Sequence, residues 1–297
     1  MVLLYSSLFN STVAVHNPYT HTTDILTFET ITQNPEYHLG GVAASPYSGL
    51  LSIVVDAGAA FNTGGKDLRG TNLLLQYDPD SEKVIYNVNL TETTKGVYGG
   101  FQDVEFDGRG NVFVVGTFPA SILKVPEGGK EVIEWYKSDD ASGTSGFGGL
   151  ATKGDILLTN YDTPGTIVRF DMRDPKGKPE TVPITPAIKL NGTDAIYLPP
   201  KYDGKVLLVA IGQKGLQVLR SRDGEWRDAE YLGLVPNNST EAAGTWTTAA
   251  VQMGENRVYM IVEYFTDAPV EGMLAGNRTR FPVVDVTEEV ERLVKGK

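Results

Sequence analysis

The sequence contains no cysteine, which excludes disulfide bonds, thiolate catalysis and cysteine-ligated metal sites. It has only three histidines and no G-x-S-x-G or H-E-x-x-H motif, so a serine triad or a zinc centre is not expected. Lys and Arg number 26 against 37 Asp and Glu, for a net charge of −11. That balance argues against nucleic acid and anionic membranes as partners. No apolar run approaches the roughly 20 residues needed to cross a bilayer.

The chain is rich in turn formers, with 33 Gly and 16 Pro among 297 residues. Short runs of alternating apolar and polar residues recur between these turns, in a unit that repeats about every 50 residues. The repeated segments are 2–30, 40–92, 99–139, 146–184, 190–235 and 244–294. We therefore predict an all-β fold, a six-bladed β-propeller, forming a single domain over residues 1–297. The first segment lacks a clear innermost run, and the last lacks a clear outer one. The only helical pattern, in residues 285–297, predicts a surface tail.

Two sets of loops differ in composition. The turns between the first and second strands of a blade read "PYSG", "DGRGN", "TKGD", "PKYDG" and "MGEN". They are short and polar, as tight hairpin connections should be, and we interpret them as structural. The loops at the opposite ends of these strands read "FQD", "NGTD", "TWT", "GTFPAS" and "EYFTDAP". Aromatic residues beside isolated polar groups are typical of a ligand pocket, so we place the site at that end.

Four residues at this end are candidate catalytic groups. Asp103 and Asp194 stand at equivalent positions just before apolar runs, where a carboxyl can act as an acid or base. They can equally serve to accept backbone N–H bonds, as turn aspartates do, and both interpretations stay open. Tyr161 and Lys214 would donate hydrogen bonds, although a lysine in such a loop is more often a solvated surface residue.

A further set of residues would form the substrate-binding walls. These are His38, Phe101, Gln102, Phe118, Thr193, Trp246, Thr247, Tyr264 and Phe265. The aromatic members could instead simply fill the channel of the propeller. We expect an apolar small-molecule substrate, no cofactor and no bound metal. A metal-dependent hydrolase stays an alternative, because several oxygen donors, such as Glu263 and Asn160, could converge there.

Six N-x-[ST] sequons begin at Asn10, Asn89, Asn191, Asn237, Asn238 and Asn277. They are more frequent than the Ser and Thr content would give by chance. A Thr-rich surface would explain them, but they also fit a protein of the secretory pathway. We expect a secreted protein whose leader is absent from this chain, since residues 1–15 do not resemble a signal peptide.

Several stretches resemble a fungal secreted six-bladed propeller family. They are "VAVHNP", "GGVAASPYSGLLSIVVDAGAAFN", "DGRGNVFVVGTFPASILKV" and "YMIVEYFTDAP…FPVVDV". The family includes a skin-yeast allergen, a protein of the trichothecene gene cluster and the hetero-Diels–Alderases of tropolonic sesquiterpenoid biosynthesis. The resemblance covers nearly the whole chain, but it carries no short catalytic signature that assigns a residue here.

The resemblance implies two functions. The first is a pericyclase that joins a tropolone o-quinone methide to a humulene-type sesquiterpene in one cofactor-free, stereoselective [4+2] cycloaddition. Orienting two reactants can remove roughly 7–11 kcal/mol of barrier. An acid such as Asp103 or Asp194 would help to expel water from a hydroxymethyl precursor. The second function is a non-catalytic binder of apolar metabolites or lipids.

Overall fold

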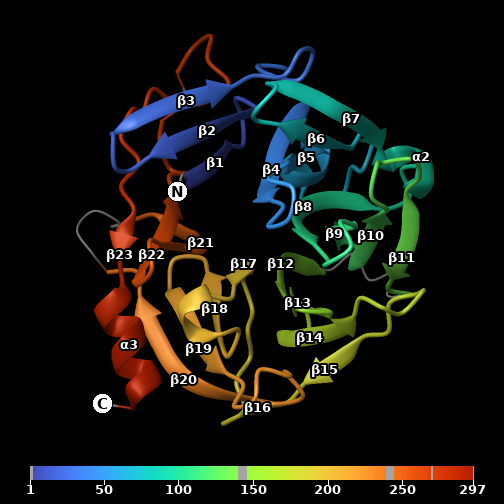
Figure 1. The fold of residues 1–297 in the computed structure, drawn as a ribbon. Helices are drawn as coiled ribbons and strands as arrows, with labels where there is room; N and C mark the ends of the chain where they lie inside the picture. Colours follow the sequence, from blue (N-terminus) through green and yellow to red (C-terminus); the bar gives the residue numbers. More distant parts are fainter. Residues whose placement is uncertain (1–2, 140–145, 239–243, 269, 297) are drawn as a thin grey trace. The chain divides into compact units, whose positions relative to one another are not determined.

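The computed structural model describes residues 3–139, 146–238, 244–268 and 270–296. These residues form six sheets, each built from strands that are consecutive or nearly so in the chain (Figure 1). Short antiparallel sheets repeated along one chain are the blades of a β-propeller, so the predicted six-bladed fold is confirmed. The chain divides into two compact units, Met1–Phe147 with Met172–Gly177, and Gly148–Asp171 with Lys178–Lys297. The single-domain assignment stays a prediction.

The first unit holds three sheets. The first is β1 (Leu3–Ser7), β2 (Thr12–Asn17) and β3 (Thr22–Leu26). The second is β4 (Tyr37–Ala44), β5 (Leu51–Ala57), β6 (Leu73–Asp78) and β7 (Lys83–Asn89). The third is β8 (Gly99–Phe106), β9 (Val112–Phe118), β10 (Ser121–Val125) and β11 (Ile133–Lys137). The first segment, which we expected to lack a clear innermost run, forms a sheet of three strands.

The second unit also holds three sheets. The first is β12 (Phe147–Lys153), β13 (Ile156–Tyr161), β14 (Thr166–Asp171) and β15 (Glu180–Val182). The second is β17 (Thr193–Tyr197), β18 (Val206–Ile211), β19 (Gly215–Arg220), β20 (Ala229–Pro236) and the short β16 (Ile184–Thr185). The third is β21 (Trp246–Met253), β22 (Arg257–Glu263) and β23 (Val284–Asp285). Residue 184 pairs in parallel with β20, so it belongs to the fifth sheet and not, as we expected, to the fourth.

The second strand of each four-stranded sheet is apolar on both faces and supplies the core. All seven residues of β5 are buried. Ile53 and Val55 pack in one cluster with residues of β1 to β4, while Val54 packs in another with residues of β8 and β9. A strand buried on both faces reads as a continuous apolar run, and successive side chains serve opposite neighbours. Asp56, near the end of this run, is the charged exception.

The helix of the last segment is not the surface tail that we expected. Helix α3 (Thr287–Lys295) packs its fully buried Val290 into a core cluster of the second unit, together with Leu293. Lys201 Nζ reaches its Glu291 carboxylate at 2.7 Å. Apolar residues at positions 286, 290, 293 and 294 form one face of the helix, which has to be covered. The helical pattern was therefore correct, but its packing was missed.

Two further short helices lie outside residues 285–297, where the sequence showed its only helical pattern. These are α1 (Gly58–Thr63) and α2 (Leu90–Thr94), and a single 3₁₀ turn, η1, covers Pro200–Tyr202. None of the helices in the described ranges is long and apolar enough to span a membrane.

The tight turn after β8 is held together by its own side chains. In the turn "DGRGN", the Asp107 carboxylate is 1% exposed and accepts the N–H groups of Arg109 and Asn111, both at 2.9 Å. The Asn111 side chain adds a third hydrogen bond at 2.6 Å. An aspartate that holds its own turn in this way is bound to the backbone and is not offered to a ligand.

Candidate functional site

A β-bulge recurs near the start of the first strand in four of the six sheets. The register shifts between Leu39 and Val42 in β4, between Phe101 and Asp103 in β8, between Thr193 and Ile196 in β17, and between Thr247 and Ala249 in β21. A bulge leaves one extra residue unpaired and turns the neighbouring side chains to new directions. The strand ends that the sequence marked as a candidate site are therefore geometrically alike.

Asp103 lies at one of these bulges, inside β8 and not before it. Its Oδ1 accepts the N–H of Val104 at 2.8 Å. A Cβ placed on Gly41 of β4 would stand 2.5 Å from the same oxygen and 2.8 Å from Asp103 Cα, so the two strands approach each other closely here. Asp103 thus accepts a backbone hydrogen bond where two sheets pack closely together. This favours the interpretation that its carboxylate bonds the backbone and does not act as an acid or base.

Asp194 lies at the equivalent joint of the second unit. A Cβ on Gly148 would stand 3.1 Å from the Asp194 carbonyl oxygen, and one on Gly149 would stand 2.6 Å from Ile196 N. A glycine pair of one sheet therefore packs against the bulge of the next sheet in both units. These glycines are required by the close approach of two backbones.

The ends of the second strands carry buried polar groups that hold the first strands in place. Thr117 of β9 donates to Phe147 O at 2.7 Å and accepts from the Gln102 amide at 2.8 Å. Gln102, predicted as a substrate-binding residue, is therefore engaged within the protein. Phe101 is 1% exposed and belongs to the core. This burial favours the interpretation that its ring fills space over the interpretation that it lines a pocket.

Asn160 plays the same part in the second unit. Its Oδ1 accepts the N–H of Gly149 at 2.7 Å, and its Nδ2 donates to Thr193 Oγ1 at 2.7 Å. Thr193 N donates to Asp162 Oδ1 at 3.0 Å. The Thr193 side chain is thus part of a hydrogen-bond network that fixes the start of β17.

Asp56 is the buried carboxyl that the sequence analysis missed. It is 6% exposed at the end of β5, and its Oδ1 accepts the N–H of Phe101 at 3.0 Å. Burial raises the pKa of Asp56 to about 7, against the lowering effect of the backbone N–H groups of Phe101 and Ala57. The signal in the sequence was an acidic residue in a mostly apolar strand. A search for alternating apolar and polar residues does not identify such a residue.

His38 stands directly opposite Asp56 in the β4–β5 ladder. It is 4% exposed, and burial lowers the pKa of its imidazole. Phe118 lies in the same unit, with its ring against Gly65 and Gly100. The first unit therefore brings together a buried ring and a buried acid.

The second unit carries an exposed aromatic pair at the start of β21. The rings of Trp246 and Phe265 meet edge to face, with centroids 6.5 Å apart and planes at 74°. Each is 41% exposed. A Cβ on Gly212 would lie 3.1 Å from the Trp246 ring, so the indole rests on backbone. Large aromatic side chains that pack against the backbone on one side and are exposed on the other are suited to binding an apolar ligand.

Glu263 lies opposite Trp246 in the β21–β22 ladder. Burial raises the pKa of this half-buried carboxyl, although the Tyr264 N–H opposes the shift. A carboxyl that holds its proton at higher pH can donate a hydrogen bond. The sequence analysis considered Glu263 only as a metal ligand, and it missed this role.

The remaining predicted site residues of this unit differ in how far they are exposed and in what they contact. Thr247 is fully buried, and its hydroxyl contacts Met260 Sδ at 3.3 Å. The Arg278 guanidinium lies 3.7 Å from the centroid of the Tyr264 ring. Lys214 is exposed in the turn after β18, and Tyr161 is the last residue of β13. The structure therefore unites Trp246 with Phe265, while Thr247 belongs to the core and Tyr264 is partly covered.

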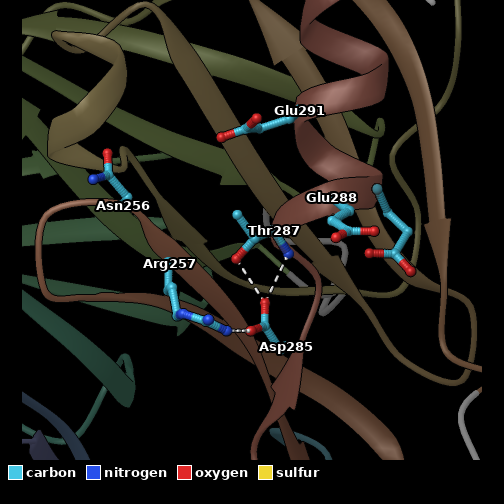
Figure 2. A pocket seen from close by; sticks show the side chains of 7 residues that line it. Asn256, Arg257, Asp285, Thr287, Glu288 and Glu291 are labelled. Carbon is cyan, nitrogen blue, oxygen red and sulfur yellow. Dashed lines mark hydrogen bonds and ion pairs between the residues drawn. The ribbon is translucent and has the colours of Figure 1, made fainter.

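A hollow of about 410 Å³ lies away from these residues, at the start of α3 (Figure 2). Asp285 sits at its centre, bonded to Arg257 at 2.6 Å and to the N–H of Thr287 at 3.0 Å. The other lining side chains include Glu288 and Glu291. Since Asp285 bonds Arg257 and the first residue of α3, we assign the hollow to folding and not to function.

A metal-dependent hydrolase would need several metal-binding side chains close together. Residues 3–139, 146–238, 244–268 and 270–296 contain no group of three or more His, Asp or Glu side chains placed to hold a metal ion. Asn160, one of the considered donors, already bonds Gly149 and Thr193. Asn160 therefore gives no support to the metal-dependent hydrolase, which stays a prediction.

Comparisons with solved structures agree with the architecture. The chain resembles the major Malassezia sympodialis allergen Mala s 1 with a TM-score of 0.82 and 22% identity, over 96% of this chain and 89% of that one. A gluconolactonase from Xanthomonas campestris, XC5397, matches with a TM-score of 0.56 and 17% identity, over 88% of this chain and 79% of that one. At these identities the likeness concerns the fold alone, and it defines the chain as a six-bladed propeller protein.

Sequence relatives narrow this class. The chain is 34% identical to trichothecene biosynthesis protein 14 of Trichoderma arundinaceum, over 99% of this chain and 84% of the relative. It is 29% identical to core trichothecene cluster protein 14 of Fusarium sporotrichioides, over 99% and 81%. No family model matches the chain. The chain belongs to the family of trichothecene cluster protein 14, and it is a propeller protein of fungal secondary metabolism.

Proposed function

We propose that the protein is a cofactor-free cyclase of a fungal secondary-metabolite pathway. The specific reaction is the hetero-Diels–Alder addition of a tropolone o-quinone methide to a humulene-type sesquiterpene. The observation that supports it is the exposed Trp246–Phe265 pair with the half-buried carboxyl of Glu263 opposite Trp246. The family's link to secondary-metabolite clusters supports a biosynthetic role.

In this proposal each group has one task. The two aromatic rings hold the apolar polyene. Glu263, whose pKa is raised by burial, donates a hydrogen bond in its protonated form to the quinone-methide oxygen, where negative charge develops in the transition state. One C–C bond and one C–O bond form, no atom is lost and no electron leaves the reactants. Orientation by the rings supplies the stereoselectivity.

A non-catalytic binder of apolar metabolites is the second candidate. The favouring observation is that the rings of Trp246 and Phe265 are both exposed, as a surface that binds an apolar ligand requires. Lys214, a predicted donor, is exposed in its turn, as a solvated lysine would be. Secretion, which we expected from the sequons, is also part of the proposal: the exposed Asn277 carries a sequon suited to glycosylation.

In the test, a hydroxymethyl tropolone precursor loses water in solution to give the o-quinone methide, and the protein joins this species to humulenol. The enantiomeric ratio of the product is measured by chiral chromatography. We expect one enantiomer to dominate, with or without EDTA. Trp246→Ala should lower kcat/KM about tenfold, as expected for the loss of an aromatic contact of ~1–1.5 kcal/mol. Glu263→Gln should lower kcat with little effect on KM.

The matched control is Tyr47→Ala. Tyr47 is 71% exposed and lies in the hairpin turn after β4, at the other end of the strands. Its loss should leave kcat/KM unchanged. Tight binding of humulenol without turnover would favour the binder, and equal losses in the Trp246 and Tyr47 variants would refute the location of the site.

A further inference from the structure

A second polar site lies in the first unit, where β4 begins and β5 ends. The His38 imidazole is 4% exposed, and its Nδ1 has no hydrogen-bond partner among the residues described. Asp56 stands opposite it in the ladder, 6% exposed. Residues that face each other in this way have Cβ atoms about 4.5–5.5 Å apart, so one small group can contact both. A buried polar atom with no partner is costly and therefore needs an explanation.

The surroundings of the imidazole are apolar. The ring of Phe9 meets it edge to face at 5.1 Å and 86°, and that of Phe61 at 5.4 Å and 78°. On a third side, a Cβ added to Gly58 would stand 3.1 Å from His38 Nε2. The glycine thus leaves room for the ring, and three neighbours fix its orientation.

We propose that His38 and Asp56 bind the hydroxyl group of an uncharged apolar alcohol, at a site separate from the Trp246–Phe265 pair. A neutral imidazole offers one donor and one acceptor, and so does a protonated carboxyl. A hydroxyl can donate to one of these groups and accept from the other. The pKa shifts of both residues favour their neutral forms, and an ion would pay the full cost of burial there. Phe9 and Phe61 then contact the hydrocarbon part of the ligand.

Access to this site runs past helix α1. Phe61 lies on α1 and is 46% exposed, so it covers His38 from the solvent side. Gly58 begins the helix, and Gly64 and Gly65 follow it with φ values of +59° and +79°. Glycines on both sides let the short helix change its backbone angles at low cost. A ligand enters by displacing the Phe61 ring and not by crossing the core.

The experiment uses the full chain labelled with ¹⁵N at histidine. The sequence has only three histidines, so imidazole signals can be assigned with single substitutions. The probes are geraniol and geranyl methyl ether, which share a carbon skeleton but differ in the hydroxyl donor. We expect geraniol to shift the His38 signals and to leave those of His16 and His21 in place. The ether should bind at least about fivefold more weakly, as the loss of one hydrogen bond predicts. Unmoved His38 signals, or equal affinity for both probes, would overturn the proposal.

Two variants, measured by calorimetry, separate this site from the proposed function. His38→Phe keeps a ring between Phe9 and Phe61, and it should reduce geraniol affinity to that of the ether. His38→Leu serves the same purpose if the first variant does not fold, because leucine also offers no donor or acceptor. Trp246→Ala should change geraniol affinity less than about twofold, even though it should lower kcat/KM for cyclisation about tenfold. If Trp246→Ala removes geraniol binding and His38→Phe does not, the alcohol binds at the aromatic pair and the proposal is wrong.

Discussion

Asp56→Asn is the substitution that most directly tests the electrostatics of the first unit. The asparagine side chain keeps the size of the aspartate, and its Oδ1 can still accept the Phe101 N–H that Asp56 accepts at 3.0 Å. The variant removes only the ability to ionise. We expect it to abolish one component of the pH dependence of folding and to leave the fold intact.

The sign follows from the direction of the pKa shift. Burial raises the pKa of Asp56 from 3.8 to about 7, so between these values the folded state holds a proton that the unfolded chain has lost. The stability that Asp56 contributes is then fully present below about pH 4 and is lost as the pH rises through about 7. A shift of about three units corresponds to about 4 kcal/mol at most, at ~1.4 kcal/mol per unit. His38 acts in the opposite direction, because its lowered pKa costs stability at acidic pH, but this cancels between wild type and variant.

The assay is urea unfolding at several pH values between about 4.5 and 8, followed by the fluorescence of Trp135, the sole tryptophan of the first unit. The stability of Asp56→Asn relative to wild type should rise with pH, by up to about 4 kcal/mol. Asp80→Asn, at an exposed turn position, is the matched control and should show no such rise. A difference between Asp56→Asn and wild type that stays constant over this range would refute the assignment of a buried, proton-holding carboxyl.

Three further substitutions test the packing. Gly41→Ala should lower the free energy of unfolding by about 1–3 kcal/mol, because the new Cβ would stand 2.5 Å from Asp103 Oδ1. Gly99→Ala is its control and should cost less, since its Cβ would meet only one amide nitrogen at 3.7 Å; equal losses in urea unfolding would contradict the crowded joint. Asp107→Ala should lower the melting temperature through the loss of its turn hydrogen bonds, about 1–3 kcal/mol in all, with no change in ligand binding. Val290→Ala should cost about 2 kcal/mol in calorimetry if α3 is part of the core, and nothing if the helix is a surface tail.

Much of the fold could be predicted from the sequence because the repeated unit is a local pattern. The six segments match the six sheets, since alternation and turn residues act over a few positions. Two features of the fold could not be predicted from the sequence, because they depend on contacts with distant residues. Residue 184 joins the fifth sheet by pairing with β20, and α3 packs against strands far earlier in the chain. Neither partner is visible in the segment itself.

The location of the candidate site stays a prediction, but the structure shows which of the predicted side chains bond within the protein and which are exposed. Asp103 was chosen because it precedes an apolar run, yet a bulge places it against the backbone of the neighbouring strand. Phe101 was chosen as an aromatic residue near a strand start, and it is buried in the core. Trp246 and Phe265 are exposed and in contact. Sequence spacing identifies the end of a strand, but a bulge decides which way each side chain points.

The same comparison explains why the acids occur on the second strands. A first strand must approach its neighbour closely enough to require glycine, so its carboxyls are used to bond the backbone. Asp56, near the end of a second strand, also accepts a backbone N–H, but it is almost fully buried. In the first unit Asp56 stands opposite the His38 ring, and in the second Glu263 stands opposite the Trp246 ring. Burial raises the pKa of both carboxyls. The fold thus places a ring beside an acid of raised pKa at equivalent positions in two blades, and the ring is buried in the first unit and exposed in the second.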